Sequence, residues 1–226
     1  MACDKFIQTH NQILLDEYKE QGPFILGPYS SYTWRHDPRH LFFTLARYKF
    51  CSKMLAGKKR VLEVGCGDAV GSQMMLQTVG TMHCTDLESL IIEDDIRRHG
   101  SDERLTFEAV DITRTAPEGN FDAAISLDVL EHVPATADDD FMRNICKNLA
   151  PQGVLILGTP NVMADAYASE NSRDGHINLK SHDTLVALMG SYFHNVFLFS
   201  MNDEVIHTGF YPMAHYFMAM GVGLKR

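Results

Sequence analysis

The feature of this sequence that most constrains its fold is a glycine-rich segment at residues 60–72, RVLEVGCGDAVGS. Its first half is a short apolar run typical of a buried strand, and Gly65 and Gly67 follow at the end of that run. Glycines at such a point allow a tight turn and let a ligand approach the backbone closely. The segment therefore predicts a strand, a turn and a helix, with a ligand site at the carboxyl end of the strand.

Short apolar runs alternate with helix-length segments from residue 58 onward. The runs lie at residues 61–65, 82–86, 105–111, 121–128 and 153–160. This alternation predicts a parallel sheet with helices on both faces. Two further runs, 195–202 and 213–223, predict a final antiparallel hairpin at the edge of the sheet. The expected fold is α/β, with seven strands that are mostly parallel.

The first 57 residues have a different pattern. Residues 4–20 have apolar positions at helical spacing, and residues 22–36, which are rich in Gly, Pro and aromatic residues, are expected to form a loop. Asp37, Pro38 and Gly57 mark the two ends of a second helix. We expect residues 1–57 to form a helical cap or substrate segment on one compact domain of residues 58–226. Arg35 and Arg39 are candidates for a clamp on a phosphate or carboxylate.

Composition excludes several classes of protein. Twenty basic against 29 acidic side chains leave a formal charge of −9, which disfavours nucleic-acid binding. The five cysteines are scattered and contain no CxxC pair, so a reducing, cytoplasmic location is expected. Residues 205–224 carry no Asp, Glu, Lys or Arg, but a Thr-Gly-Phe-Tyr-Pro turn divides them, and we expect no membrane span. The N-terminus does not have the pattern of a signal peptide.

Two details separate the glycine-rich segment from a dinucleotide site. The glycines are Gly65, Gly67 and Gly71, which is not the GxGxxG spacing, and Glu63 lies inside the strand. A carboxylate at that position suits a cationic ligand better than a pyrophosphate. An acidic residue followed by G-x-G resembles the first motif of the class I S-adenosylmethionine-dependent methyltransferases, although Ala69 replaces the third glycine of that family. The resemblance implies a Rossmann-like fold and S-adenosylmethionine as the cofactor.

The resemblance also implies roles for residues at the ends of the later strands. Asp86 would bind the ribose hydroxyls, and Asp111 would bind the adenine amino group with Ile112 against the ring. Alternatively, Asp86 and Asp111 are ordinary polar residues at strand ends. The full set of implied cofactor contacts is Glu63, Gly65, Cys66, Gly67, Asp86, Leu87, Asp111, Ile112 and Leu127.

The segment SLDVLEHV at residues 126–133 is the candidate for catalysis. In a helix, Asp128, Glu131 and His132 would share one face, where Asp128 and His132 would be catalytic; the alternative is ordinary helix capping. The segment resembles ubiquinone-biosynthesis O-methyltransferases. It is also similar to small-RNA 2′-O-methyltransferases, which implies a divalent metal held by Asp128, Glu131, His132 and His176, with His182 as the substitute for His176. The residue types do not choose among magnesium, manganese, zinc and iron.

The expected function is methyl transfer from S-adenosylmethionine to a small-molecule acceptor. The whole chain is similar to bacterial methyltransferases associated with surface glycans, which implies a hydroxyl oxygen of a sugar or glycan precursor. The alternatives are a phenolic or quinone-type acceptor, and a protein that binds the cofactor without catalysis. The Met-rich segment 214–222 is either sheet core or the surface of a homodimer.

Overall fold

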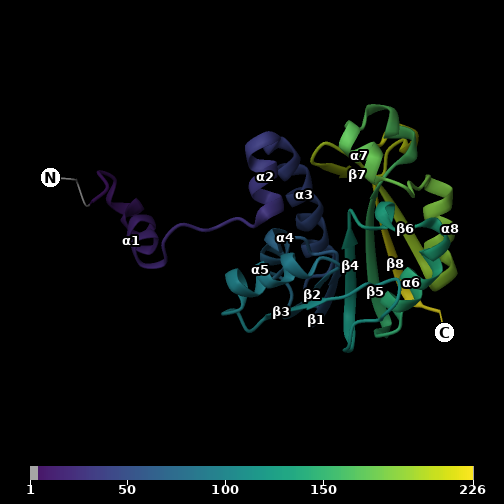
Figure 1. Ribbon diagram of the computed structural model, residues 1–226, viewed down its shortest axis with the longest axis horizontal. Coiled ribbons are helices and arrows are strands. Elements are labelled where there is room, and N and C mark those ends of the chain that lie inside the picture. The colour runs from purple at the N-terminus through teal and green to yellow at the C-terminus, as the bar shows by residue number, and fades with distance from the viewer. Residues whose placement is uncertain (1–4, 226) are drawn as a thin grey trace.

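The glycine-rich segment lies in the middle of the sheet in the computed structural model, which describes residues 5–225 (Figure 1). The parallel strands are β1 (Arg60–Val64), β2 (Thr81–Asp86), β3 (Leu105–Ala109), β4 (Phe121–Leu127) and β5 (Leu149–Pro160). Strands β6 (Phe193–Asn202) and β8 (Tyr216–Leu224) form the predicted antiparallel hairpin. The order across the sheet is β3-β2-β1-β4-β5-β8-β6-β7.

The predicted fold class is confirmed, with one correction to the number of strands. The sheet has eight strands because Val205–His207 forms an additional short strand, β7, which pairs with the end of β6. The residues between β6 and β7 turn tightly, and Asp203 there has a positive φ of 48°. A strand of three residues is too short to give a periodic signal in the sequence.

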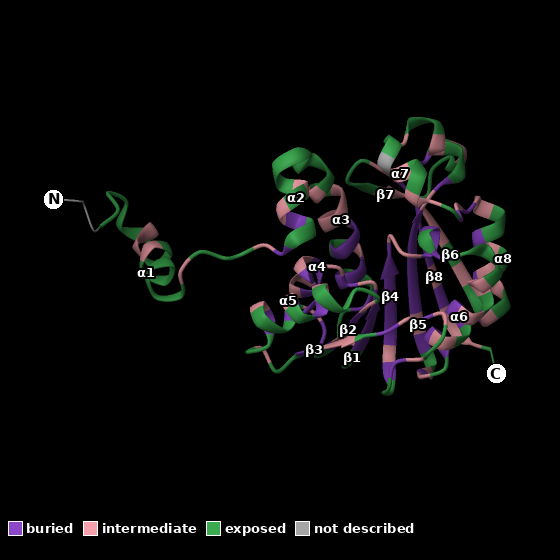
Figure 2. Cartoon of the chain, in the orientation of Figure 1, coloured by how far each residue is buried: buried purple, intermediate pink, exposed green. Residues whose placement is uncertain are grey.

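Helices cover both faces of the sheet, and each face has its own apolar core. One core packs residues of α3 (Pro38–Met54), α4 (Val70–Met75) and α5 (Ser89–His99) on the sheet, including Tyr48, Met75 and Ile92. The other packs α6 (Asp138–Cys146) and α8 (His182–Tyr192), including Phe141 and Leu185. Figure 2 shows the inner strands β1 and β4 as almost continuously buried, whereas β3, β6 and β7 are partly exposed. The short helix α7 (Glu170–Gly175) lies above the carboxyl end of the parallel strands.

The N-terminal segment differs in part from the expectation. Helix α1 (Gln12–Gln21) confirms only the second half of the first predicted helix, because residues 5–8 are not helical, and it stands apart from the body of the molecule in Figure 1. Residues 28–36, predicted as loop, form helix α2 (Pro28–His36), because Pro28 supplies a suitable φ for the first helical position. Tyr48 of helix α3 packs in the same apolar core as the strands of the sheet. The predicted boundary at residue 57, between a cap segment and the main domain, stays a prediction.

Two expectations drawn from composition can be compared with the described residues. Cys51, Cys66, Cys84 and Cys146 are free and buried, while Cys3 lies outside the described part of the chain. Among residues 5–225, no helix combines the length and the apolar character that a membrane span requires.

Candidate active site

The loop between β1 and α4 has the backbone that its glycines predict. Gly65 and Gly67 have φ values of 77° and 53°, in the left-handed region that glycine adopts most easily. A Cβ atom on Gly65 would lie 2.1 Å from Cγ2 of Val129, so this position also lacks room for a side chain. Ala69, at the position of the missing third glycine, takes a left-handed conformation with φ of 56°.

A cavity of about 700 Å³ opens over this loop, at the carboxyl ends of the parallel strands. This is where a doubly wound sheet binds its ligands. The predicted residues that line it are Gly65, Cys66, Gly67, Asp86, Leu87, Asp111, Ile112, Leu127, Asp128 and His132. The predicted residues outside its lining are Glu63, Glu131 and His176.

Asp86 is held in place by the backbone around it. One carboxylate oxygen accepts a hydrogen bond from the Gly67 amide at 3.0 Å, and the other accepts one from the Glu88 amide at 3.0 Å. Each oxygen keeps a lone pair, so the carboxylate can still accept from a pair of ligand hydroxyls.

Asp111 begins the turn after β3. One of its oxygens accepts from the amide and the hydroxyl of Thr113, at 3.0 and 2.6 Å, and the other pairs with Arg114 Nε at 3.1 Å. Ile112, the next residue, is buried and lines the cavity. The side chain of Asp111 is therefore fixed at the rim, and an amino group of a ligand would compete with these contacts.

Glu63 was predicted to contact the cofactor, but it lies beneath the loop and does not face the cavity. Its carboxylate accepts from the Tyr48 hydroxyl at 2.6 Å and from the Ser72 hydroxyl at 2.5 Å. The side chain is almost completely buried, and this burial raises the pKa of Glu63 to about 7. Because Tyr48 belongs to α3 and Ser72 to α4, Glu63 joins both helices to β1 under the ligand site.

Asp128 directly follows β4 and has a left-handed conformation, with φ of 57°. Its carboxylate accepts from Nη1 of Arg47 at 2.5 Å, and the Arg47 side chain is only 5% exposed. The guanidinium also lies 3.7 Å from the centre of the Tyr216 ring, a cation–π contact. Arg47 is a site residue that the sequence analysis missed, because nothing local relates α3 to a residue 81 positions later.

The prediction of a helix across residues 128–132 is therefore wrong. The positive φ of Asp128 breaks the helical path, and only a 3₁₀ turn, Leu130–His132, follows. Glu131, His132 and His176 come together with one potential ligand atom each, all within 4.8 Å of one another, whereas Asp128 is not part of this group. His182, the substitute, instead pairs with Asp183 and stacks on Tyr211.

This group, hereafter the Glu131–His132–His176 group, has distinctive polar contacts. Oε2 of Glu131 accepts from the Thr159 hydroxyl at 3.0 Å, while Oε1 is buried with no hydrogen-bond partner among the described residues. Burial, with a smaller effect of Asp128, raises the pKa of Glu131 to about 8. Nδ1 of His132 lies 2.9 Å from the Gly175 carbonyl oxygen, which can only accept, so Nδ1 donates and carries the proton.

Helices α2 and α3 provide the wall of the cavity opposite the sheet. The lining residues from these helices are Tyr29, Ser30, Thr33, His40, Leu41, Thr44 and Tyr48. The sequence analysis noticed this stretch only for its aromatic and basic residues. Arg35 and Arg39, the candidate anion clamp, are exposed and do not line the cavity, which contains carboxylates but no Lys or Arg among its described lining residues.

Comparison with known proteins agrees with this architecture. Residues 34–192 match the family model described as a methyltransferase domain. Ubiquinone biosynthesis O-methyltransferase from Xanthomonas oryzae pv. oryzae is 33% identical over 118 residues, which are 50% of this chain and 48% of that protein. The chain thus spans about half the length of the curated relatives it matches.

Two solved structures illustrate the similarity of the fold. N-methyltransferase NodS from Bradyrhizobium japonicum WM9, in complex with S-adenosylhomocysteine, has a TM-score of 0.61 and 20% identity, covering 84% of this chain and 91% of that one. The methyltransferase domain of bacterial CtHen1-C has a TM-score of 0.65 and 17% identity, covering 80% and 99%. The fold and the loop define a class I S-adenosylmethionine-dependent methyltransferase. The chain belongs to the methyltransferase domain family.

Proposed function

We propose that the protein transfers the methyl group of S-adenosylmethionine to a hydroxyl oxygen of a small-molecule acceptor. The observation that carries this proposal is the orientation of His132 at the cavity wall. Its Nδ1 donates to the Gly175 carbonyl, which leaves Nε2 as the ring nitrogen that can accept a proton. A hydroxyl acceptor needs such a base, whereas an amine needs only to arrive uncharged.

The residues around the glycine loop fit the cofactor. Asp86 would hold the ribose hydroxyls, Ile112 would pack on the adenine, and Gly65 and Gly67 would allow its close approach. When bound, S-adenosylmethionine supplies an electrophilic methyl group on a sulfonium. The carboxylates of Asp86, Glu88, Asp111 and Asp128, which line the cavity, favour a ligand with this positive charge.

His132 and the walls of α2 and α3 then act on the acceptor. The cavity walls hold the acceptor oxygen in line with the methyl group, an effect of proximity worth up to roughly 7–11 kcal/mol. Nε2 of His132 would take the hydroxyl proton, while the bound methyl donor would supply the methyl group and keep the electron pair of its C–S bond on sulfur. The carboxylate of Asp128 lines the same cavity and is fixed by Arg47.

A sugar or glycan precursor remains our proposed acceptor. Thr33, His40 and Thr44 line the cavity with groups that can hydrogen-bond to several hydroxyls of one ring. The second candidate is a phenolic or quinone-type metabolite, which is favoured by the name of the curated relatives and by the apolar lining residues Leu41 and Val133. A cytoplasmic location and a homodimer also stay predictions.

A panel of acceptors with radiolabelled cofactor tests the proposal. Labelled product from sugars supports the sugar acceptor, and product from phenols alone replaces it with the second candidate. Product only from amines would refute oxygen transfer. Tight binding of S-adenosylhomocysteine without turnover on any acceptor would favour a non-catalytic, cofactor-binding protein.

A divalent cation in the Glu131–His132–His176 group is an alternative way to activate the hydroxyl. The unpartnered, buried Oε1 of Glu131 could bind a cation, and two imidazoles with a carboxylate suit zinc, manganese or iron. Such a cation would lower the pKa of the acceptor hydroxyl, and His132 would serve as a ligand instead of the base.

Treatment with a chelator distinguishes the two roles of His132. Activity that survives chelation supports His132 as the base. Activity that is lost and then restored by one added metal ion, but not in Glu131→Gln, supports the cation.

A further inference from the structure

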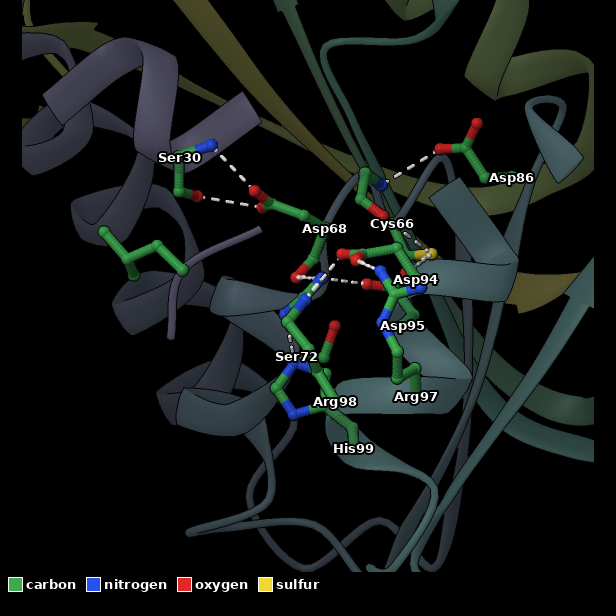
Figure 3. A network of polar contacts seen from close by, with 12 residues as sticks. Ser30, Cys66, Asp68, Ser72, Asp86, Asp94, Asp95, Arg97, Arg98 and His99 are labelled. Atoms are coloured by element: carbon green, nitrogen blue, oxygen red, sulfur yellow. Dashed lines mark hydrogen bonds and ion pairs between the residues drawn. The ribbon is translucent and has the colours of Figure 1, made fainter. Parts of the chain in front are cut away.

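Helix α2 is joined to the glycine loop through Asp68, the residue that follows Gly67. Asp68 is 5% exposed, and its two carboxylate oxygens accept from the backbone amide and the hydroxyl of Ser30, at 2.7 and 2.8 Å. Figure 3 shows the two bonds side by side. A carboxylate bound at both oxygens is fixed in orientation as well as in position. We call this pair of bonds the Asp68–Ser30 contact.

Helix α2 needs this contact because its own sequence does not provide a cap. Ser30 lies in the first turn, where backbone amides have no acceptor within the helix. Gly27, the residue before the helix, has no side chain that could accept from them. Asp68, 38 positions later, supplies the acceptor and places a negative charge at the positive end of the helix.

Asp68 is also held from the opposite side by α5. Nη2 of Arg98 donates to the backbone oxygen of Asp68 at 3.1 Å, and the Arg98 side chain is 8% exposed. Arg98 is fixed in turn by Asp94 and Asp95, at 2.6 and 2.5 Å, as Figure 3 shows. The loop is therefore anchored to the body of the domain by α5, and α2 is held against this anchored loop through Ser30.

Gly27 gives the chain room to reach Asp68. A Cβ atom on Gly27 would lie 2.3 Å from Cβ of Asp68 and 2.5 Å from Nη2 of Arg98. Its φ of −74° is ordinary for any residue, so the close approach, and not the backbone conformation, requires glycine. The positions of Gly27, Ser30 and Asp68 thus depend on one another.

We propose that Asp68 is a positioning residue for cofactor binding, which it promotes by holding α2 over the cavity. Tyr29 and Thr33 of α2 line the cavity together with Gly67 and Asp86. The Gly67 amide donates to Asp86, and the next residue holds α2, so one short segment serves both the ribose site and the helix. Cofactor binding and the placement of α2 favour each other by linkage. This inference rests on the proposed function only in taking the ligand to be the methyl donor.

Trp34 provides a direct measurement of α2. It is the one tryptophan in the sequence, it lies on α2, and it is 54% exposed. In the intact protein, S-adenosylhomocysteine should reduce quenching of its fluorescence by acrylamide. In Asp68→Ala, the affinity for S-adenosylhomocysteine by calorimetry should fall about tenfold, and the ligand should no longer change the quenching.

Matched variants separate positioning from a general loss of structure. Ser31→Ala is the control, because Ser31 is adjacent to Ser30 and its hydroxyl donates to the nearby Leu26 carbonyl instead of to Asp68. Ser30→Ala should lose part of the affinity, and the double variant with Asp68→Ala should be no weaker than Asp68→Ala alone. Asp68→Asn, with the same volume, should be intermediate in affinity and serves if Asp68→Ala does not fold.

The outcomes distinguish this inference from the proposed function. An Asp68→Asn or Asp68→Ala protein that binds S-adenosylhomocysteine and protects Trp34 as the parent does would overturn the inference. Additive losses in the double variant would overturn it as well. An unaltered chain that does not bind S-adenosylhomocysteine would refute the proposed function itself. Binding that leaves Trp34 quenching unchanged would refute only the role of Asp68.

Discussion

Replacing Glu63 by glutamine should alter how the stability of the protein depends on pH. Glu63 is buried below the glycine loop and accepts hydrogen bonds from Tyr48 and Ser72. Both partners carry hydroxyl groups, which can donate or accept, so the amide of glutamine can be accommodated with little change in volume. The variant therefore removes the ionisation of this residue while keeping the packing around it.

The magnitude follows from the pKa of Glu63, which burial raises from 4.5 to about 7. That difference corresponds to about 3 kcal/mol. The folded protein binds the proton of Glu63 more tightly than the unfolded chain does. The stability that this difference contributes is therefore fully present below about pH 4.5 and is lost as the pH rises to about 7. Above that pH Glu63 is ionised in the folded protein, and the free-energy cost of burying its charge fully opposes folding. Glu63→Gln does not carry this cost.

Urea denaturation at a series of pH values, from about pH 5 to about pH 8, measures the effect. The free energy of unfolding of the unaltered protein, relative to that of Glu63→Gln, should fall by about 2.5 kcal/mol over this range, since part of the full difference lies below pH 5. Other buried groups that titrate contribute equally to both proteins, so their effects cancel in the comparison. Glu131 is one of them, because burial raises its pKa to about 8. Parallel curves for the two proteins would refute the argument, because they would show that Glu63 does not ionise differently on folding.

Three further substitutions test the site. Asp86→Ala should weaken S-adenosylhomocysteine binding at least about tenfold by calorimetry, and an unchanged affinity would remove the ribose assignment. His132→Ala should lower kcat by about 100-fold or more while cofactor affinity stays nearly the same; an active variant would exclude His132 as the base. Arg47→Met should lower the free energy of unfolding by about 1–2 kcal/mol, because Asp128 loses its buried partner but is itself 38% exposed and partly screened by water. Arg39→Met, at an exposed position of the same helix, is the control for Arg47 and should be nearly neutral.

The sequence alone predicted the parts of the molecule that local patterns determine. The apolar runs located seven of the strands, and the glycines at 65 and 67 located the turn where the cavity opens. Asp86 could be predicted because a residue at the end of a parallel strand must lie at the same edge as the glycine loop. These inferences need only the spacing of apolar residues and glycines along the sequence and the sheet topology that this spacing implies.

The prediction for residues 128–132 shows where this kind of reasoning stops. Helical spacing would place Asp128, Glu131 and His132 on one face, but the left-handed backbone at Asp128 directs its carboxylate to Arg47. Glu131 and His132 meet His176 instead. A residue's backbone conformation at a strand end depends on what packs against it, which no local pattern encodes.

Contacts between distant segments decided the rest of the site. Ser30 with Asp68, Arg47 with Asp128, and His132 with Gly175 each join residues more than 35 positions apart, at separations of 38, 81 and 43. Each pair includes a polar group that the fold removes wholly or partly from water, and such a group must find a partner inside the protein. The sequence determined which chemical groups were present along the chain. The tertiary structure decided which of them became partners, because burial makes an unpaired polar group costly only once the segments have packed together.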